Sequence, residues 1–423
     1  MRENFLHYIW KYKKIDLRRL FTTNKELVRI VSVGEHNHNS GPDFFNAQLY
    51  IDEQLWAGNV EIHLKSSDWY LHHHEQDKNY DNVILHVVWQ HDSEVFRKDN
   101  TSIPTLELQN NINKKALQNY QKLFSKQQKW INCENDIKGV HDFIINNWLE
   151  RLYFERLERK YLEVEDLLKA SKNNWEAVLF KMLAKNFGLK VNSDAFLSIA
   201  NSFDFKILQK IQPKLLSLEA LFFGQAELLQ ANVEDAYYKK LQREYLYLKQ
   251  KFSLTNSSVV PLQFFRLRPT NFPTIRLSQL AILYHQQSNL FSKIIKVKTV
   301  DELYVIFNVA ASAYWETHYT FNKASKYSKK QITKSFVDLL IINTIMPLQF
   351  SYIKHQGKPI EDFSWALIQQ IASEKNNIVA KYNQLGLVSK TALNSQALLQ
   401  LKTEYCNKNK CLQCAIGNTL LNS

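Results

Sequence analysis

The first hundred residues alternate between short apolar runs and polar, turn-forming stretches. An amphipathic helix is expected over residues 3–14, where apolar side chains recur at helical spacing, and residues 69–81 favour a second helix. Runs of strand length and strand composition lie between and after these helices. The expected strands are residues 27–33, 44–51, 56–64, 83–89 and 102–108. The order helix, three strands, helix, strand predicts an α+β domain over residues 1–110.

From residue 111 the chain changes to long stretches of helical periodicity with few glycines or prolines. The clearest are residues 143–168, 235–252 and 277–295, in which apolar side chains recur every three or four positions. We find no repeat of fixed period, which favours a helical bundle over a solenoid. Residues 111–423 are therefore predicted to form a large, mainly α-helical region, long enough for two subdomains.

The composition is that of a soluble globular protein. Hydrophobic residues make up 45% of the chain, enough for packed cores, and only 9 Gly and 8 Pro argue against a disordered chain. The first twenty residues are charged throughout and show no secretory signal. The most apolar later stretch, residues 336–350, contains polar residues and is too short to span a membrane. Four cysteines do not make a disulfide framework, so a cytoplasmic location is expected.

Charge is divided unevenly along the chain. Residues 1–100 carry 12 Lys+Arg and 15 Asp+Glu, whereas the remaining residues carry 42 and 26. Nine of the 13 histidines also precede residue 92. An acidic, histidine-rich segment suits metal binding, and a basic remainder suits a polyanion such as nucleic acid. The alternative is that the lysines only keep a helical surface soluble.

The segment GPDFFNAQLYIDEQLWAGNVEIHLK holds the residues best suited to catalysis. Glu61, His63 and Lys65 share one face of a strand, because side chains alternate along it, and the apolar residues between them face a core. Asp43 stands at the entrance of the preceding strand, where hairpin pairing would bring it beside Glu61. Two carboxylates so placed can hold Mg²⁺ or Mn²⁺. A nearby Lys or His can orient or deprotonate the attacking water.

These residues resemble the active-site pattern of the PD-(D/E)XK nuclease superfamily. A Pro-Asp pair ends at Asp43, seventeen residues follow, and then come Glu61-x-His63 and Lys65. The predicted order of helices and strands over residues 1–95 is similar to the core of that superfamily. The resemblance implies that Asp43 and Glu61 bind a metal. It also implies that Lys65 or His63 is the catalytic base-like group, although His63 stands where the superfamily has lysine.

Some members of that superfamily carry an extra acidic ligand on the first helix, and Glu3 matches it. The resemblance thus implies a metal-dependent nuclease that hydrolyses DNA or RNA with Mg²⁺ or Mn²⁺. The displaced lysine leaves a second interpretation open: a non-catalytic nucleic-acid-binding or scaffold protein that keeps a degenerate nuclease core.

Histidines form a second group in the same region. They are His36, His38, His72, His73 and His74, with Asp77 close by. Imidazoles two residues apart can share a face of a strand, and His74 and Asp77 can share a face of a helix. Together they offer a zinc-dependent hydrolase site with an open coordination position, without the H-E-x-x-H spacing that would support it. The alternative is that they are surface or supporting groups. His86, inside an apolar run, is expected to be a core histidine.

Cys406, Cys411 and Cys414 have the close spacing of metal–thiolate sites and copy the first three ligands of plant-type ferredoxins. Cys133 is the one other cysteine and the candidate for a fourth thiolate. An iron–sulfur cluster or a zinc ion bound by these four would join the C-terminal end to the segment after the N-terminal domain. Some nucleases of the resembled superfamily close an iron–sulfur cluster with one distant cysteine and three near the C-terminus. The alternative is ordinary reduced cysteines.

Arg266, Arg268 and Arg276 flank two prolines and alternate with phenylalanines. Guanidinium groups suit phosphates and aromatic rings suit unstacked bases, so this segment is a candidate nucleic-acid contact. The alternative is a buried connector whose arginines cap helix C-termini.

The whole chain also resembles a family of uncharacterised bacterial proteins known only as a domain of unknown function. The resemblance rests on the segments GPDFFNAQL, GNVEIHLKSSDW, RPTNFPTIRLSQLA and CLQCAIG. It implies a bacterial source and brings no activity with it.

Overall fold

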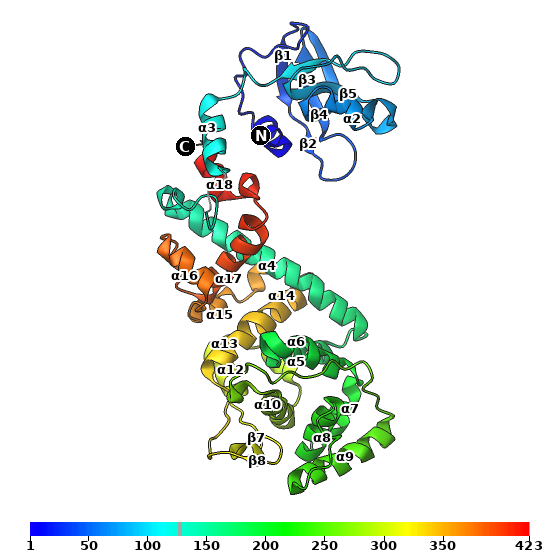
Figure 1. Ribbon diagram of the computed structural model, residues 1–423, viewed down its shortest axis with the longest axis vertical. Helices are drawn as coiled ribbons and strands as arrows, with labels where there is room; N and C mark the ends of the chain where they lie inside the picture. The colour runs from blue at the N-terminus through cyan, green and yellow to red at the C-terminus, as the bar shows by residue number, and fades with distance from the viewer. Residues whose placement is uncertain (126–128, 423) are drawn as a thin grey trace. The chain divides into compact units, whose positions relative to one another are not determined.

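A computed structural model describes residues 1–125 and 129–422, which form two compact units. The first unit contains Met1–Trp148 with the segment from Leu401 onward, and the second contains Leu149–Gln400. The first holds a β-sheet and the second is mainly helical (Figure 1), so the predicted mixed α/β chain with a large helical part is confirmed.

The sheet unit extends beyond residue 110, where the sequence pattern changes. Helix α3 (Lys114–Leu123) packs against α18 (Ala415–Asn422), and this contact keeps both segments in the first unit. A boundary placed by periodicity alone therefore differs from the division by packing, because α3 is helical in pattern yet belongs to the sheet unit.

The first unit is built on a mixed sheet with strand order β1-β3-β4-β5-β6, and β2 also pairs with β3. Pairing is antiparallel from β1 to β4 and parallel from β4 to β6. Helix α1 (Glu3–Lys11) packs on β4. The strands are β1 Val28–Ser32, β2 Glu35–His36, β3 Phe44–Ile51, β4 Gln54–Lys65, β5 Val83–Gln90 and β6 Thr105–Glu107. The predicted strands all form, with ends shifted by a few residues.

The crossover between β4 and β5 differs from the helix expected over residues 69–81. It contains a single helical turn, α2 (Asp68–Leu71), followed by the short 3-10 turns His74–Gln76 and Lys78–Tyr80. His73 adopts a left-handed backbone with φ of 59°, which ends the helix. The side chain of Asp77 then accepts from the backbone N–H of Asn79 and starts the second turn.

Strand β4 is buried on both faces near its middle. Val60 and Ile62 lie in the apolar core, as their alternation predicts. Glu61 and His63 point to the opposite face and are also buried, with 5% and 1% of their surface exposed. The polar face of the strand is therefore enclosed around Glu61 and His63.

The second unit consists of helices joined by short connections, with one small hairpin of β7 and β8. Several helices begin at a polar residue whose side chain accepts from a backbone N–H of the first turn, as for Asn174, Asp235 and Thr333. The elements are α4 Asp142–Ala170 (which starts in the first unit), α5 Trp175–Phe187, α6 Leu189–Asn201, α7 Phe205–Ile211, α8 Leu215–Gln225, α9 Ala236–Phe252, α10 Pro273–Gln286, α11 Leu290–Ile294, α12 Val300–Ile306, β7 His318–Thr320, β8 Lys323–Ala324, α13 Lys334–Leu340, α14 Met346–His355, α15 Trp365–Gln370, α16 Asn377–Gln384 and α17 Ala392–Gln400.

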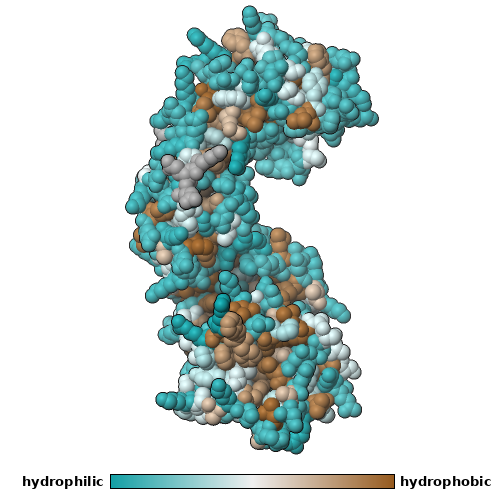
Figure 2. All heavy atoms as spheres, viewed as in Figure 1, coloured by the Kyte–Doolittle hydropathy of each residue, from teal (hydrophilic) through white to brown (hydrophobic). Residues whose placement is uncertain are grey.

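The stretch Lys334–His355 is longer than the apolar run seen in the sequence, because α13, a π-helical turn and α14 form one continuous helix. It is long and apolar enough to cross a membrane, but 72% of its most apolar window is buried inside the protein, as in the core helix of a soluble protein. The face in Figure 2 is mostly hydrophilic, with hydrophobic residues in separate patches.

Candidate metal centre in the sheet unit

Asp43 is held at the start of β3 by a polar loop. The side-chain amide of Asn37 lies 3.1–3.4 Å from the backbone carbonyls of residues 39–42. The backbone N–H of Asn37 donates to the carbonyl of Asp43 at 2.8 Å. Gly41 has a φ of 101°, which glycine adopts without strain. Local contacts thus fix where Asp43 enters the sheet.

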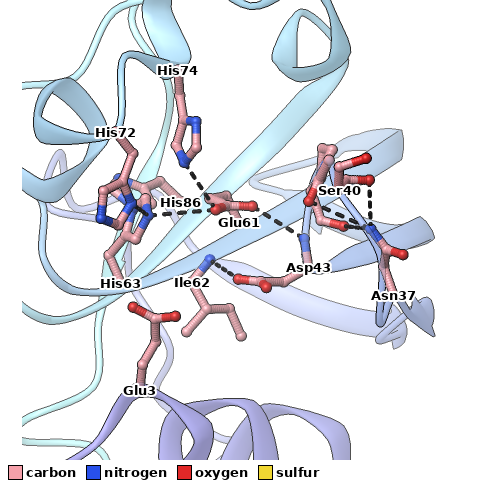
Figure 3. Close-up of polar contacts among 12 residues, drawn as sticks. Glu3, Asn37, Ser40, Asp43, Glu61, Ile62, His63, His72, His74 and His86 are labelled. Atoms are coloured by element: carbon pink, nitrogen blue, oxygen red, sulfur yellow. Dashed lines mark hydrogen bonds and ion pairs between the residues drawn. The ribbon is translucent and has the colours of Figure 1, made fainter.

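Strand pairing brings Asp43 beside Glu61, as the hairpin pattern predicts. Phe44 pairs with Val60. The backbone N–H of Asp43 donates to Glu61 Oε2 at 3.1 Å, and the backbone N–H of Ile62 donates to Asp43 Oδ2 at 3.0 Å (Figure 3). These two hydrogen bonds connect each carboxylate to the backbone of the neighbouring segment. The other oxygen of Glu61, Oε1, faces His63 and His74.

Two histidines lie beside the remaining oxygen of Glu61, and a third lies beside one of them (Figure 3). His63 Nε2 lies 3.4 Å from Glu61 Oε1, and His74 Nε2 lies 3.3 Å from the same atom. His72 Nδ1 lies 3.1 Å from His63 Nε2. The ligand atoms of the three histidines all lie within 4.8 Å of one another. His63 comes from β4, while His72 and His74 come from the crossover after α2.

The spacing of the three imidazoles suits a metal ion. In a tetrahedral site, nitrogen ligands lie about 2.0–2.1 Å from the metal and therefore about 3.3 Å from one another. His63 Nε2 and His72 Nδ1 lie 3.1 Å apart, and the ligand atoms of His63, His72 and His74 all lie within 4.8 Å of one another, with Glu61 beside His63 and His74. Three imidazoles next to a carboxylate form a donor set suited to zinc, and also to manganese or iron.

The electrostatics of the cluster also favour a cation. Burial, with the nearby charge of Asp43, raises the pKa of Glu61 to about 9. Burial and the neighbouring imidazoles lower the pKa of His63 to about 3. The protein thus encloses the carboxyl group of Glu61 next to a His63 imidazole that favours its neutral form. A bound divalent cation would supply the charge that favours the ionised carboxylate.

His86 supports the cluster from β5, where it is paired with Glu61 across the sheet. It is fully buried, as expected for a core histidine, and its Nε2 lies 2.9 Å from His63 Nδ1. When His63 uses Nε2 as a ligand, its Nδ1–H donates to His86, which fixes the ring orientation as supporting groups do in metal sites. The spacing of 23 residues gives no local signal for this contact.

His7 on α1 is a site residue that the sequence pattern did not single out. Its Nε2 lies 3.2 Å from Asp43 Oδ2 and 3.7 Å from Glu3 Oε1. Burial lowers the pKa of His7, but the hydrogen bond and charge of Asp43 outweigh it and raise the pKa overall. Glu3 therefore sits beside the carboxylate pair, next to His7. The i,i+4 spacing of Glu3 and His7 was the available signal.

The other polar residues expected near the site lie elsewhere. The Lys65 side chain is 57% exposed at the end of β4, with Nζ 3.8 Å from Asp92 Oδ2. It lies on the same face as Glu61, but at the end of the strand and beyond the enclosed part of that face. His36 stacks on Phe44, and its ring also lies beside the ring of His7. The ring of His38 lies beside that of His36.

The three arginines of the helical unit separate into two kinds. Arg266 and Arg268 are exposed on the loop before α10. Arg276 is buried: it donates to Gln279 and Asn271, and its guanidinium lies 3.7 Å from the ring centre of Phe336. Because its donors face the protein interior, Arg276 is not exposed for contact with nucleic acid, and the roles of Arg266 and Arg268 stay predictions.

The four cysteines come together in the sheet unit, where all of them line one cavity. Cys133 supplies the first part of the wall, and Cys406, Cys411 and Cys414 supply the rest from the C-terminal segment. This cavity is separate from the histidine cluster, since it is lined by none of the same residues.

The residues of the candidate metal centre all fall within the range that a known sequence family matches. The family described as "Protein of unknown function (DUF2851)" matches residues 3–377. No curated protein and no solved structure matches the chain. Because the match covers most of its length, including the whole histidine–carboxylate cluster, the chain belongs to the DUF2851 family.

Proposed function

We propose that this protein is a metal-dependent hydrolase of phosphodiester bonds in nucleic acid. Its metal centre is formed by His63, His72 and His74, with Glu61 beside them. The observation that carries the proposal is the convergence of three imidazole nitrogens within 4.8 Å of one another, beside the carboxyl groups of Glu61 and Asp43. The nitrogen-rich donor set favours zinc or manganese over magnesium.

The residues around the centre have separable roles. A bound divalent cation would polarise the phosphate and activate a water. Glu61 and His63 hold the inner side of the centre, because both are buried. His72 is exposed and marks the side from which a substrate enters. Asp43, 20% exposed and hydrogen-bonded to Ile62, is placed to accept a proton from the water.

His7 supplies the positive group that the displaced lysine does not. Its raised pKa favours the protonated form between Asp43 and Glu3. A protonated imidazole at this place can neutralise negative charge on a phosphate. The position of Asp43 and Glu61 on consecutive paired strands, before a crossover to a parallel strand, supports the similarity to the PD-(D/E)XK core.

A nucleic-acid substrate is supported by the charge of the helical unit. Leu149–Gln400 carries 33 Lys+Arg against 21 Asp+Glu, whereas the sheet unit is nearly neutral. Arg266 and Arg268 are exposed beside Phe265, whose side chain is 76% exposed. Basic groups interleaved with an exposed ring suit a single-stranded polyanion.

One observation favours a second candidate, a nucleic-acid-binding protein with a metal site but no catalysis. Lys65, the expected catalytic lysine, faces Asp92 in solvent rather than Glu61. If Glu61 also binds the metal, four protein ligands close a tetrahedral site, and closed sites are typical of structural metals.

Cleavage assays separate the two candidates. Purified protein is incubated with single- and double-stranded DNA and RNA in Mg²⁺, Mn²⁺ or Zn²⁺, and bound metal is measured in parallel. We expect cleavage in Mn²⁺ or Zn²⁺, a loss of at least 100-fold in Glu61→Gln, and full activity in the control Lys65→Ala. Metal bound without cleavage of any substrate would favour the non-catalytic candidate. Cleavage by Glu61→Gln at the parent rate would refute the proposed centre.

A further inference from the structure

The structure places four cysteines around one cavity, although Cys133 is 273 residues from Cys406 in sequence. Cys133 and Cys414 are buried, and Cys406 and Cys411 are partly buried. The remaining wall is mostly apolar and includes Ile131, Ile137, Leu401 and Ile416. Such walls exclude water from the space between the sulfurs, which is the environment of a bound inorganic group rather than of a reactive surface thiol.

Local structure fixes each cysteine at the cavity. Cys133 sits in a turn in which its carbonyl accepts from the backbone N–H groups of Asp136 and Ile137 at 3.0 and 2.9 Å. Cys406 ends a π-helical turn, Leu401–Cys406, and Cys411 begins the 3-10 turn Cys411–Gln413. Cys414 directly precedes α18. The C-terminal segment therefore supplies three of the cysteines at the cavity, and the turn around Cys133 supplies the fourth.

Gly417 allows the C-terminal segment to close around the cavity. A Cβ atom at this position would lie 2.2 Å from the backbone carbonyl oxygen of Cys411, closer than any side chain tolerates. The first turn of α18 therefore packs directly on the turn that carries Cys411, and glycine is required at this contact.

Hydrogen-bond donors point at the sulfurs. The side-chain amide of Asn132 lies 3.4 Å from Cys411 Sγ, and the backbone N–H groups of Ile416 and Gly417 are directed at the Cys414 sulfur. Donors of this kind stabilise metal-bound thiolates.

The four thiols surround a space. Four thiolates on one zinc ion, with Zn–S of about 2.3 Å, meet at a single point. Here Cys133, Cys406, Cys411 and Cys414 line the wall of a cavity together with apolar side chains. A cavity between the thiols suits an iron–sulfide core, which is larger than one ion.

We propose that Cys133, Cys406, Cys411 and Cys414 bind a [4Fe–4S] cluster, which fastens the C-terminal segment to the sheet unit. The family match ends at residue 377 and does not reach three of these ligands. The site is independent of the hydrolytic centre and stands whether or not the protein cleaves nucleic acid.

The cluster reinforces a set of contacts that hold α18. Tyr8 donates to Asn418 at 2.7 Å, and α18 packs against α3. Lys402 donates to the carbonyl of Trp130 at 2.7 Å and lies over its ring. These bonds join segments far apart in sequence, so a cluster at the same place contributes directly to the folding of the sheet unit.

The test is chemical analysis of the full-length protein purified without oxygen. We expect about four iron and four acid-labile sulfide per chain, with a broad absorption near about 400 nm. One equivalent of zinc with no iron would overturn the cluster, and the absence of both metals would overturn the site.

Variants then assign the ligands. Cys133→Ser and Cys411→Ser are each expected to lose most of the iron, whereas the control His63→Ala keeps it, since His63 belongs to the other centre. If the serine variants are insoluble, the iron and sulfide content of the parent protein still decides the question. Full iron content in soluble Cys133→Ser would overturn the four-cysteine assignment. Loss of nucleic-acid cleavage in His63→Ala with iron intact would separate the two sites.

Discussion

Each unit of the protein buries a glutamate, and the two differ in what surrounds the carboxyl group. Glu219 in α8 is 2% exposed and accepts hydrogen bonds from the hydroxyls of Tyr237 and Ser278, both at 2.5 Å. Glu61 in β4 is 5% exposed and meets the imidazoles of His63 and His74. Burial raises the pKa of both carboxyl groups.

The donors decide what each carboxyl group can do. Hydroxyls donate to the carboxyl group of Glu219 and satisfy it inside the protein, which is a structural arrangement. The imidazole nitrogens of His63 and His74 lie beside Glu61 instead, and imidazole lone pairs can bind a cation. Burial alone therefore does not identify a functional carboxylate. The type of neighbouring group, hydroxyl or imidazole, distinguishes the two carboxyl groups. Variants in each region test this difference.

The largest expected effect is stabilisation by metal in the Glu61 region. Zn²⁺ at about a thousand times its dissociation constant should raise the free energy of unfolding by about 4 kcal/mol, because it binds the folded state. His63→Ala and His74→Ala should each lose this increase, while Glu219→Gln keeps it. Thermal melts with and without Zn²⁺ measure the effect. An equal increase in the parent and in both histidine variants would place the metal elsewhere.

Removing the carboxyl group of Glu219 should act on stability alone. Glu219→Ala is expected to lower the free energy of unfolding by about 2–4 kcal/mol, because Tyr237 and Ser278 lose a buried acceptor and a cavity remains. Metal content should not change. Denaturant unfolding and metal analysis of the same sample check both parts. Loss of metal in this variant would remove the contrast between the two regions.

The pH dependence of stability should also report Glu219. Its pKa is raised by burial, so the folded state holds the proton more tightly than the unfolded state. Its contribution to stability is present below the ordinary glutamate pKa and is lost as pH rises through the raised value, with a slope of at most about 1.4 kcal/mol per pH unit. Glu219→Gln should flatten this part of the curve. Unfolding midpoints from pH 5 to 8 measure it, and identical curves would contradict it.

The smallest expected effect concerns the basic surface of the helical unit. Arg266→Ala and Arg268→Ala should each weaken binding to single-stranded DNA several-fold and reduce its salt dependence by about one phosphate contact. Metal content and cleavage chemistry should remain as in the parent. Fluorescence titrations at several salt concentrations measure the change. Unaltered affinity in the double variant would remove this loop from the nucleic-acid surface.

The sequence by itself determined the elements and part of the site. Alternation and periodicity located the strands and long helices, because burial of one face imposes a period on each element. The same alternation placed Glu61 and His63 on one face, and the Pro-Asp turn placed Asp43 beside them. Convergence of Cys133 with the C-terminal cysteines also followed the sequence pattern, since only one other cysteine was present.

The tertiary structure decided which polar groups meet. His7 and His86 reach the cluster through packing of α1 and parallel pairing of β5, and the irregular crossover brings His74 to Glu61. The i,i+4 spacing of Glu3 and His7 is a local signal, but it does not show where α1 packs. Lys65 lies on the predicted face but beyond the enclosed part of the strand, where its side chain is exposed and lies beside Asp92. Sequence periodicity specifies the face of an element, whereas the contacts across elements depend on where each chain segment ends and turns.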